Sequence, residues 1–382
     1  MIELSDTQAQ FAAEVARFAA EEIAPHATEW DTEDRYPVEL FGRLGRLGWL
    51  GVGFDEVVGG SGGGPVERCL LIEGLAHASA GVALGVYVHT ALAAGALAEI
   101  AAPELRDKFL PGLLAGEITG AWAYAEPDAG ADVTRARLTA RRDGDHFVLD
   151  GVKTYITNGT FADLILVVAR TGLEPGRLRG LSVIAVDGET PGLTRRSMAK
   201  VGMHPSELAE LHLDAVRVPV GRVLGDEETG FRQCLAVLSK GRVFGGALAL
   251  GLGGAALDAA VDHVVNREQF GGPLTQLQAV RFNLADMAAR LRAARGLVYD
   301  AAAAMASGRD FDTDASIAKL TASEAATWLC ERAMHLHGAQ GFMSDSPVQR
   351  YYRDCKILEY GEGANEVQRE MIAKALVLGY RP

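Results

Sequence analysis

Residues 163–170 read Asp163-Leu164-Ile165-Leu166-Val167-Val168-Ala169-Arg170, and this stretch decides the fold class. A continuous apolar run with valine and isoleucine, bounded by charged residues, is typical of a buried β-strand. Further β-type runs lie at 118–125, 146–150, 181–186 and 211–218, separated by turn signals such as Asn158-Gly159 and Asp187-Gly188. Short strands at this spacing predict a small antiparallel barrel or sandwich between residues 118 and 225, and not β-α-β units.

Both flanks of this region have the periodicity of helices. On the N-terminal side, Ser5-Asp6-Thr7-Gln8 has the form of a capping box, and helices are predicted up to Pro25 and at about 37–48, 66–79, 82–100 and 104–115. On the C-terminal side, helices are predicted at about 228–266, 275–306, 313–337 and 365–379, with Asn365 as the cap of the last one. We therefore predict an α+β protein, mainly α, with a helical domain at 1–117, a β domain at 118–225 and a second helical domain at 226–382.

Composition limits the class of partner. The chain has 382 residues and a formal net charge of −13, and an acidic surface repels phosphates. We therefore expect neither nucleic acid nor an anionic membrane as a main partner. The four cysteines stand far apart, without the spacing of a metal site or a disulfide framework, and the first six residues lack the pattern of a signal peptide. Both features favour a reducing, cytoplasmic location.

Two stretches invite other interpretations. Residues 82–102 are apolar enough to raise the question of a membrane span, but their alanine and glycine content favours a buried core helix. Gly251-Leu252-Gly253-Gly254 has the look of a dinucleotide-binding loop, yet it lies in a predicted helix with no strand before it. Close packing of that helix against another is the favoured interpretation.

The candidate for acid–base chemistry is the segment Glu359-Tyr360-Gly361-Glu362-Gly363-Ala364-Asn365-Glu366. Glu362 stands between two glycines, just ahead of a predicted helix, where the backbone has conformational freedom and space for a ligand. A carboxylate held there acts as a general base if burial raises its pKa. A solvated acidic turn is the alternative, and this segment alone leaves both open.

Four short motifs, in the same order along the chain, resemble those of the acyl-CoA dehydrogenases. The segment 125–132 (AEPDAGAD) is similar to the family's TEPxAGSD, 151–159 (GVKTYITNG) to GxKxWITNG, 267–271 (REQFG) to RxQFG, and 362–369 (EGANEVQR) to EGTxEIQR. The resemblance covers the whole chain. It implies a middle antiparallel β-barrel, a C-terminal four-helix bundle, FAD as cofactor and a homotetramer built as a dimer of dimers.

The resemblance also implies the activity and the partners. Such an enzyme oxidises an acyl-CoA thioester to the trans-2-enoyl thioester, in fatty-acid or amino-acid catabolism, and passes electrons to an electron-transferring flavoprotein. The reaction requires a base for the α-proton, a hydride acceptor and donors that stabilise the developing enolate.

Single residues receive roles by the same resemblance. Glu362 matches the base, with Arg242 as a second catalytic residue, and Gly241 matches the helical position that holds the base in some relatives. Implied acyl-CoA contacts are Ala131, Arg242 and Gly363. Implied FAD contacts are Tyr124, Ala125, Ala131, Tyr155, Thr157, Ala364 and Glu366, together with Arg267, Phe270, Gln278, His335, Gly338 and Ala339, several of them reaching FAD from a neighbouring subunit.

Departures from the family pattern leave alternatives open. Ala125 and Ala131 stand where a threonine and a serine are usual, so two hydroxyl donors are missing, and an acyl group on a carrier protein is an alternative substrate. A second alternative is that the chain is a family member that uses oxygen as electron acceptor, against which Glu362 argues. A third is a non-catalytic helical assembly protein of the same fold, against which Thr157, Arg267 and Glu362 argue together.

Overall fold

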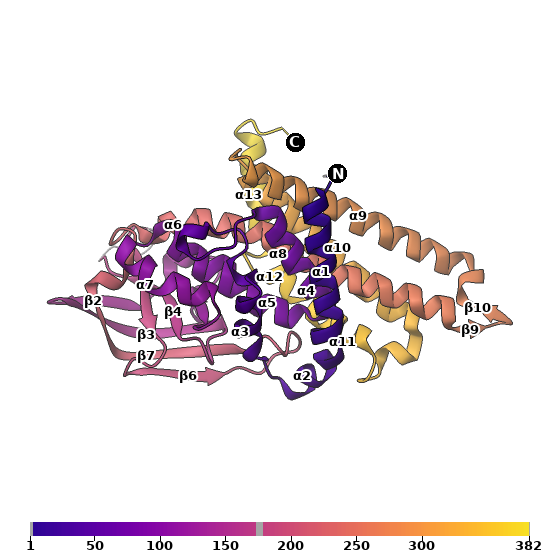
Figure 1. Cartoon of the computed structure of the whole chain (residues 1–382), viewed down its shortest axis with the longest axis horizontal. Coiled ribbons are helices and arrows are strands. Elements are labelled where there is room, and N and C mark those ends of the chain that lie inside the picture. Colours follow the sequence, from indigo (N-terminus) through magenta and orange to yellow (C-terminus); the bar gives the residue numbers. More distant parts are fainter. Residues whose placement is uncertain (1–2, 173–178, 382) are drawn as a thin grey trace.

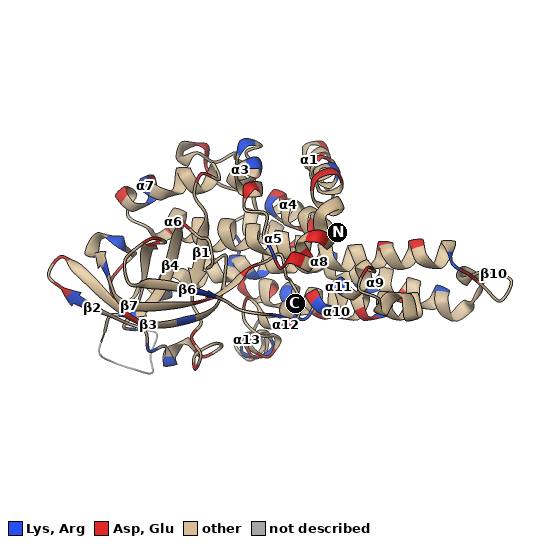
Figure 2. Ribbon diagram, turned by 90° about the horizontal axis from the view of Figure 1, so that it is seen from below, with Lys and Arg blue, Asp and Glu red and all other residues tan. Residues whose placement is uncertain are grey.

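The computed structural model describes residues 3–172 and 179–381. The β-sheet lies at one end of an elongated molecule and long C-terminal helices extend to the other end; of the N-terminal helices, α1, α4 and α5 lie in the middle, whereas α6 and α7 lie over the sheet (Figure 1). Acidic and basic side chains are interspersed over helices and sheet (Figure 2). The predicted order of helical, β and helical regions is thus confirmed.

The N-terminal region is helical, as predicted. Its first helix begins with the expected capping box, in which Gln8 N donates to Ser5 Oγ at 3.2 Å and Ser5 N donates to Gln8 Oε1 at 3.0 Å. The α-helices are α1 (Asp6–Phe18), α2 (Ala27–Glu33), α3 (Glu39–Arg46), α4 (Pro65–Ala78), α5 (Ala80–Tyr87), α6 (Gly95–Ile100) and α7 (Pro103–Leu114). The π-helical segment η5 (Val88–Ala94) joins α5 to α6.

The middle region forms one mixed sheet, ordered β6-β7-β3-β2-β4-β5-β8, with β1 beside β4. Strands β1 and β2 pair with β4 in parallel, and the other pairings are antiparallel. Among the described strands, β6 and β8 do not pair with each other, so the sheet is not a closed barrel. The strands are β1 (Gly120–Ala123), β2 (Thr139–Asp143), β3 (His146–Thr157), β4 (Leu164–Arg170), β5 (Leu181–Asp187), β6 (Leu193–Ser197), β7 (Leu208–Pro219) and β8 (Val223–Leu224).

Strand β4 shows why its sequence is continuously apolar. Leu164, Leu166 and Val168 point into the large core that the sheet shares with the helices. Ile165, Val167 and Ala169 point to the opposite face, into a separate core formed by the sheet itself. Because side chains alternate between the two faces of a strand, burial on both faces requires an apolar residue at every position.

The C-terminal region contains the long helices α8 (Gly230–Asn266), α9 (Gln278–Ala306) and α10 (Asp312–His337), followed by α11 (Pro347–Asp354), α12 (Ile357–Tyr360) and α13 (Asn365–Val377). Helix α10 packs against α8, α9 and α13, and a small hairpin of β9 (Glu268–Gln269) and β10 (Gly272–Pro273) joins α8 to α9. One predicted detail was wrong: the cap position of α13 is Ala364, because Asn365 is the first helical residue and its side chain bonds to α10 instead.

Two helical stretches, 80–100 and 230–266, are long and apolar enough to cross a membrane, judged by length and composition. Their most apolar windows are 94% and 72% buried inside the protein. Core helices have the same composition, and this burial agrees with the core interpretation of residues 82–102.

Gly251 allows α8 to approach α4 closely, which confirms the packing interpretation of the glycine-rich stretch. A Cβ atom added at Gly251 would lie 2.2 Å from the backbone oxygen of Glu73 and 2.6 Å from the Cβ of Ala76. Both neighbours are held by helical backbone, so the two helices would have to separate.

Gly251→Ala is therefore expected to lower stability by about 1–3 kcal/mol, the usual cost of overpacking a core. Gly254→Ala in the same helix is the matched control, because its nearest neighbour would be His77 Cδ2 at 3.4 Å. Thermal unfolding followed by circular dichroism checks both variants. Equal midpoints for the two would contradict the packing assigned to Gly251.

Candidate active site

Glu362 lies in the turn between α12 and α13, with its own backbone in the left-handed region. Its φ is 56° and that of Gly363 is 83°. A residue with a side chain adopts this conformation only where its surroundings fix it, and such positions cluster at functional sites. The glycines were expected to supply the conformational freedom, but Glu362 itself carries the unusual angle together with Gly363.

The Glu362 side chain rests on bare backbone of α8. A Cβ added at Gly241 would lie 2.9 Å from Glu362 Oε2, and one added at Gly245 would lie 3.6 Å from Glu362 Cγ. The two glycines stand four residues apart, so they share one face of the helix. Larger residues on this face would occupy the space that the carboxylate now fills.

Hydrogen bonds from α10 and α13 hold the turn in place. Lys319 Nζ donates to Gly363 O at 2.9 Å and to Asn365 Oδ1 at 2.8 Å, and Ser323 Oγ donates to Asn365 Oδ1 at 3.1 Å. Gln368 Nε2 donates to the carbonyls of Glu362 and Gly363 at 3.2 and 3.1 Å. Lys319 is only 3% exposed, and burial lowers its pKa to about 8. The strained turn is thus fixed by donors aimed at its carbonyl groups.

The electrostatic surroundings of Glu362 suit a base. Burial raises the pKa of its carboxyl group, and a hydrogen bond with Tyr87 and the charges of Arg242 and Lys319 partly offset that rise. Burial also raises the pKa of Tyr124 to about 12, with the charges of Asp132 and Glu362 adding to the effect. Tyr124, directly before the first motif, is therefore close enough in space to Glu362 to interact electrostatically.

Arg242 is one residue beyond Gly241 on α8 and is partly buried. Burial lowers the pKa of its guanidinium, and the Glu362 charge opposes that shift. Its Nη1 donates to Ser239 Oγ at 3.2 Å, whereas its Nε has no hydrogen-bond partner among the described residues. No described ion pair joins Arg242 to Glu362, so its expected catalytic and substrate-binding roles stay predictions.

The second motif forms the end of β3, where the strand bulges. The register with β7 shifts between Lys153 and Ile156, and Tyr155 has a φ of 60° and is 62% exposed. A bulge redirects a side chain, and here it presents an aromatic ring to the solvent two residues before Thr157. An exposed ring in a fixed backbone conformation fits the flat ring system of FAD.

A buried ion pair joins the first two motifs. Lys153 Nζ donates to Glu126 Oε1 at 2.8 Å and to Tyr124 O at 3.0 Å, and burial lowers the pKa of Lys153 to about 8. The Glu126 carboxylate also accepts from the backbone N–H groups of Arg137 and Leu138, at 2.6 and 3.0 Å. The loop that carries Tyr124 and Ala125 is thereby fixed beside β3, whereas Ala131 farther along it is exposed.

The remaining predicted FAD contacts lie elsewhere. Arg267, Phe270 and Gln278 surround the β9–β10 hairpin, which Figure 1 places at the end of the molecule opposite the sheet. All three are exposed, and Phe270 has 89% of its surface accessible and a φ of 55°. They are not brought together with Tyr155 and Glu362 within one chain, as expected if they serve a neighbouring subunit. Of the others, Ala364 adjoins Glu362, whereas His335, Gly338, Ala339 and Glu366 are exposed.

Family models match three consecutive parts of the chain. They are the acyl-CoA dehydrogenase N-terminal domain over residues 5–117, the middle domain over 121–216 and the C-terminal domain over 228–377. The chain belongs to the acyl-CoA dehydrogenase family. Acyl-CoA dehydrogenases are FAD-dependent oxidoreductases.

Individual relatives agree along the full length of this acyl-CoA dehydrogenase. A probable acyl-CoA dehydrogenase of Bacillus subtilis is 38% identical over 376 residues, covering 98% of this chain and 99% of the relative. The structure of butyryl-CoA dehydrogenase from Megasphaera elsdenii matches with a TM-score of 0.95 and 36% identity, covering 99% and 100% of the two chains. A chain in a structure of the electron transferring flavoprotein of Acidaminococcus fermentans matches with a TM-score of 0.96 and 33% identity, covering 99% of both.

Sequence reasoning missed the residues that position the site. Lys319 and Ser323 stand in a helix, where a lone polar residue suggests a solvated face, and Gln368 lies in the last quoted motif without a role; their partners are backbone or amide groups without a sequence pattern. Glu126 and Lys153 lay inside quoted motifs but received no role. The signal that could have found this pair is that each is a charged residue inside an apolar strand or turn region, which demands a buried partner.

Lys319→Met is expected to destabilise the protein by about 1–3 kcal/mol, because the carbonyl of Gly363 and the buried side chain of Asn365 would each lose one of their two donors. Lys240→Met on α8 is the control, since Lys240 pairs with Glu99 at the surface and a pair of that kind contributes about 1 kcal/mol or less. Thermal unfolding measures both. A loss no larger than that of the control would contradict the role given to Lys319.

Proposed function

We propose that Glu362 removes the α-proton of an acyl-CoA thioester, which is oxidised to the trans-2-enoyl thioester. The observation that carries this proposal is the position of its carboxylate, on the bare face of α8 at Gly241 and in surroundings that raise its pKa. Bound FAD supplies the acceptor for the hydride from the β-carbon. The protein's task is to hold the thioester between that acceptor and the carboxylate.

The balance of charges around Glu362 supports its use as a base. Full desolvation alone would keep the carboxyl group protonated, and strong cation pairing alone would make it a weak base. Burial dominates here, while Tyr87, Arg242 and Lys319 preserve the ionised form. A carboxylate tuned in this way has a pKa closer to the operating pH than an ordinary glutamate, as general-base catalysis requires.

Glu362→Gln should retain FAD and bind acyl-CoA but reduce the flavin roughly 10²–10⁴-fold more slowly, which is the usual contribution of a general base. Anaerobic bleaching of the yellow flavin by butyryl-CoA measures the rate. Glu359→Gln is the control, because Glu359 forms a partly exposed pair with Lys356. Near-normal bleaching in Glu362→Gln would remove Glu362 from its role.

We further propose that FAD lies across two subunits. Tyr124, Ala125, Ala131, Tyr155 and Thr157 would contact its ring end, with Ala364 and Glu366 nearby, and the nucleotide end would meet Arg267, Phe270, Gln278, His335, Gly338 and Ala339 of a neighbouring copy. The exposure of Phe270 and Tyr155 supports this arrangement.

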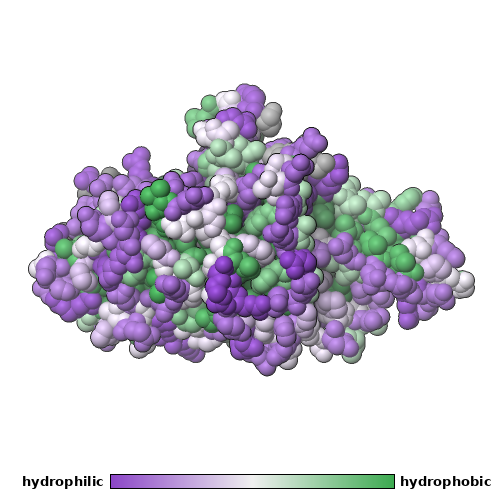
Figure 3. All heavy atoms as spheres, viewed as in Figure 1, coloured by the Kyte–Doolittle hydropathy of each residue, from purple (hydrophilic) through white to green (hydrophobic). Residues whose placement is uncertain are grey.

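A homotetramer, as a dimer of dimers, accounts for the apolar surface at the outer end of the bundle. Apolar side chains gather there, over the ends of α8 and α9 (Figure 3). The exposed apolar residues of this end are Val261, Val265, Phe270, Leu277 and Phe282. Contiguous apolar surface of this kind marks an interaction site in most soluble proteins.

Arg267→Ala is expected to weaken FAD binding, because a phosphate charge would lose its guanidinium partner, which is worth roughly 2–4 kcal/mol. The protein should purify partly colourless and regain activity with added FAD. Arg141→Ala, on the exposed side of β2, serves as the control. Full flavin occupancy with weaker acyl-CoA binding would place Arg267 at the substrate instead.

Four further assignments belong to the same proposal. Ala131, Arg242 and Gly363 contact the acyl-CoA, and an electron-transferring flavoprotein reoxidises the enzyme, which the similarity to the Acidaminococcus fermentans structure supports. A reducing cytoplasm suits the four buried free cysteines. The domains divide at residues 117/118 and 225/226.

A further inference from the structure

We propose that Tyr87 closes the acyl pocket directly beyond Glu362 and so restricts the enzyme to short acyl groups. This inference rests on the proposed role of Glu362 as base. It names a substrate class, short acyl thioesters, and a residue that selects it.

The position of Tyr87 is fixed by contacts on α8. It is the last residue of α5, it is 1% exposed, and its hydroxyl donates to the carbonyl oxygen of Gly241 at 3.2 Å. A Cβ added at Gly241 would lie 3.0 Å from Tyr87 Oη, 2.9 Å from Glu362 Oε2 and 3.3 Å from Leu92 Cδ2. The phenol hydroxyl, the carboxylate and the leucine methyl therefore share one small space.

This geometry leaves little room for a long acyl chain. The α-carbon of the substrate must come within about 3–3.5 Å of the reacting carboxylate oxygen, so the carbons beyond it enter the space beside Gly241. Two walls bound that space: α8, with Gly241 and Gly245, and the α5–η5 segment, with Tyr87 and Leu92. A longer chain would have to displace the tyrosine ring.

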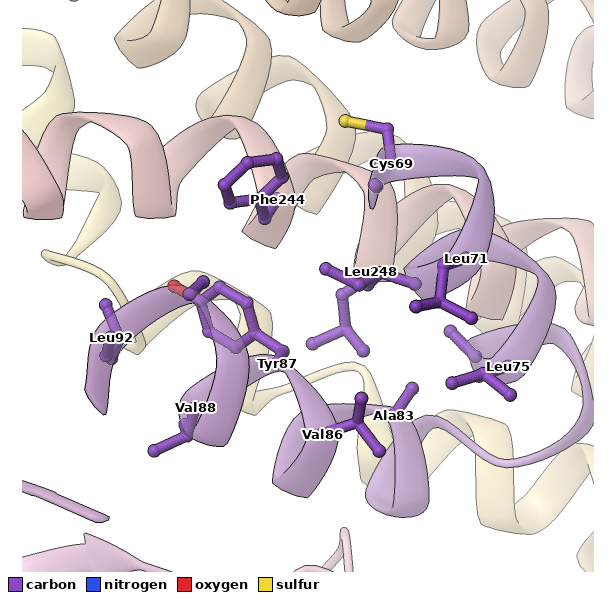
Figure 4. Close-up of a cluster of buried hydrophobic side chains, with 14 of the residues drawn as sticks. Cys69, Leu71, Leu75, Ala83, Val86, Tyr87, Val88, Leu92, Phe244 and Leu248 are labelled. Carbon is purple, nitrogen blue, oxygen red and sulfur yellow. The ribbon is translucent and has the colours of Figure 1, made fainter. Parts of the chain in front are cut away.

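The ring itself belongs to the main buried core. Figure 4 shows it on the side of the α5–η5 helix that faces α8, toward Phe244 and Leu248, while its chain neighbours Val86 and Val88 point to other sides of that helix. All four of these neighbours belong to the main buried core. Because core side chains are close-packed, rotation of the ring would require these neighbours to move.

The hydroxyl of Tyr87 has a second effect, on the base. Its single proton has two acceptors in reach, the Gly241 carbonyl and the Glu362 carboxylate. Donation to the carboxylate holds the pKa of Glu362 below the value that burial alone would produce, in company with Arg242 from α8 and Lys319 from α10. Tyr124 also faces this charge, from the loop after β1. Tyr87 is a positioning residue in this respect, and its ring and its hydroxyl are separable by substitution.

The pocket test compares wild type with Tyr87→Leu and Tyr87→Ala, using anaerobic flavin bleaching by butyryl-, hexanoyl-, octanoyl- and decanoyl-CoA. Wild type should reduce fastest with a short chain. In the truncated variants the ratio of the octanoyl-CoA to the butyryl-CoA rate constant should rise about tenfold or more, the discrimination expected when a pocket gains space for additional methylenes. Tyr87→Phe keeps the ring and should keep the wild-type dependence of the rate on acyl chain length.

The results distinguish a failure of the proposed function from a failure of the pocket role assigned to Tyr87. If none of the four acyl-CoAs bleaches the flavin of the wild-type protein, the proposed function is overturned. Wild-type protein that prefers octanoyl-CoA, or truncated variants with an unchanged ratio, overturns the role of Tyr87 and leaves the function intact. If neither truncated variant folds with bound flavin, the wild-type profile still decides, because a pocket closed at Tyr87 excludes the longer chains.

The hydroxyl test uses Tyr87→Phe and the pH dependence of the bleaching rate with butyryl-CoA. Removing a donor to the carboxylate raises the pKa of Glu362, so the acid limb of the profile should move to higher pH. A purely structural role of Tyr87 would change the rate without moving that limb. An acid limb at the wild-type position would overturn the effect assigned to the hydroxyl.

Discussion

The hydrogen bonds from Lys319 to the Glu362 turn are the interaction on which the rest of the site depends. A buried ammonium group is stable only when its donors are satisfied, and here the carbonyl of Gly363 and the side chain of Asn365 satisfy two of them. The same bonds fix a turn in which a glutamate has a φ of 56°. The carboxylate is thereby held against α8 without a direct ion pair to any described cation, and such a pair would have lowered its basicity.

The long helices explain how distant parts of the sequence meet at this carboxylate. Helix α8 contributes Gly241 and Arg242, α10 contributes Lys319 and α5 contributes Tyr87, and α10 packs on α8 along the bundle. The sheet adds the loop of Tyr124, fixed by the buried pair of Lys153 and Glu126. Strand β4 is apolar on both faces and contributes side chains to both hydrophobic cores, which packs the sheet against the helices.

The sequence predicted those features whose cause is local. The apolar run of β4 and the capping box at Ser5 have direct signatures, and Glu362 was conspicuous between its glycines. Strands β2 and β6 were missed because most of their residues are exposed, which leaves little apolar pattern. Asn365 was taken for a helix cap because its residue type favours that position. In the structure its side chain instead accepts hydrogen bonds from Lys319 and Ser323. Tyr87 and Lys319 carried no signal, since what they contact depends entirely on helix packing.

The central claim is that the catalytic carboxylate acts in the space beside Gly241 of α8. Moving this carboxylate from position 362 to position 241 tests the claim most directly. Glycine suits the backbone at position 362, where φ is 56°, so Glu362→Gly should fold and bind FAD while losing flavin reduction. Because a Cβ at Gly241 lies beside the former carboxylate position, Gly241→Glu in that background should restore measurable anaerobic bleaching by an acyl-CoA. A double variant that retains FAD, binds acyl-CoA and stays as inactive as Glu362→Gly would contradict this location of the base.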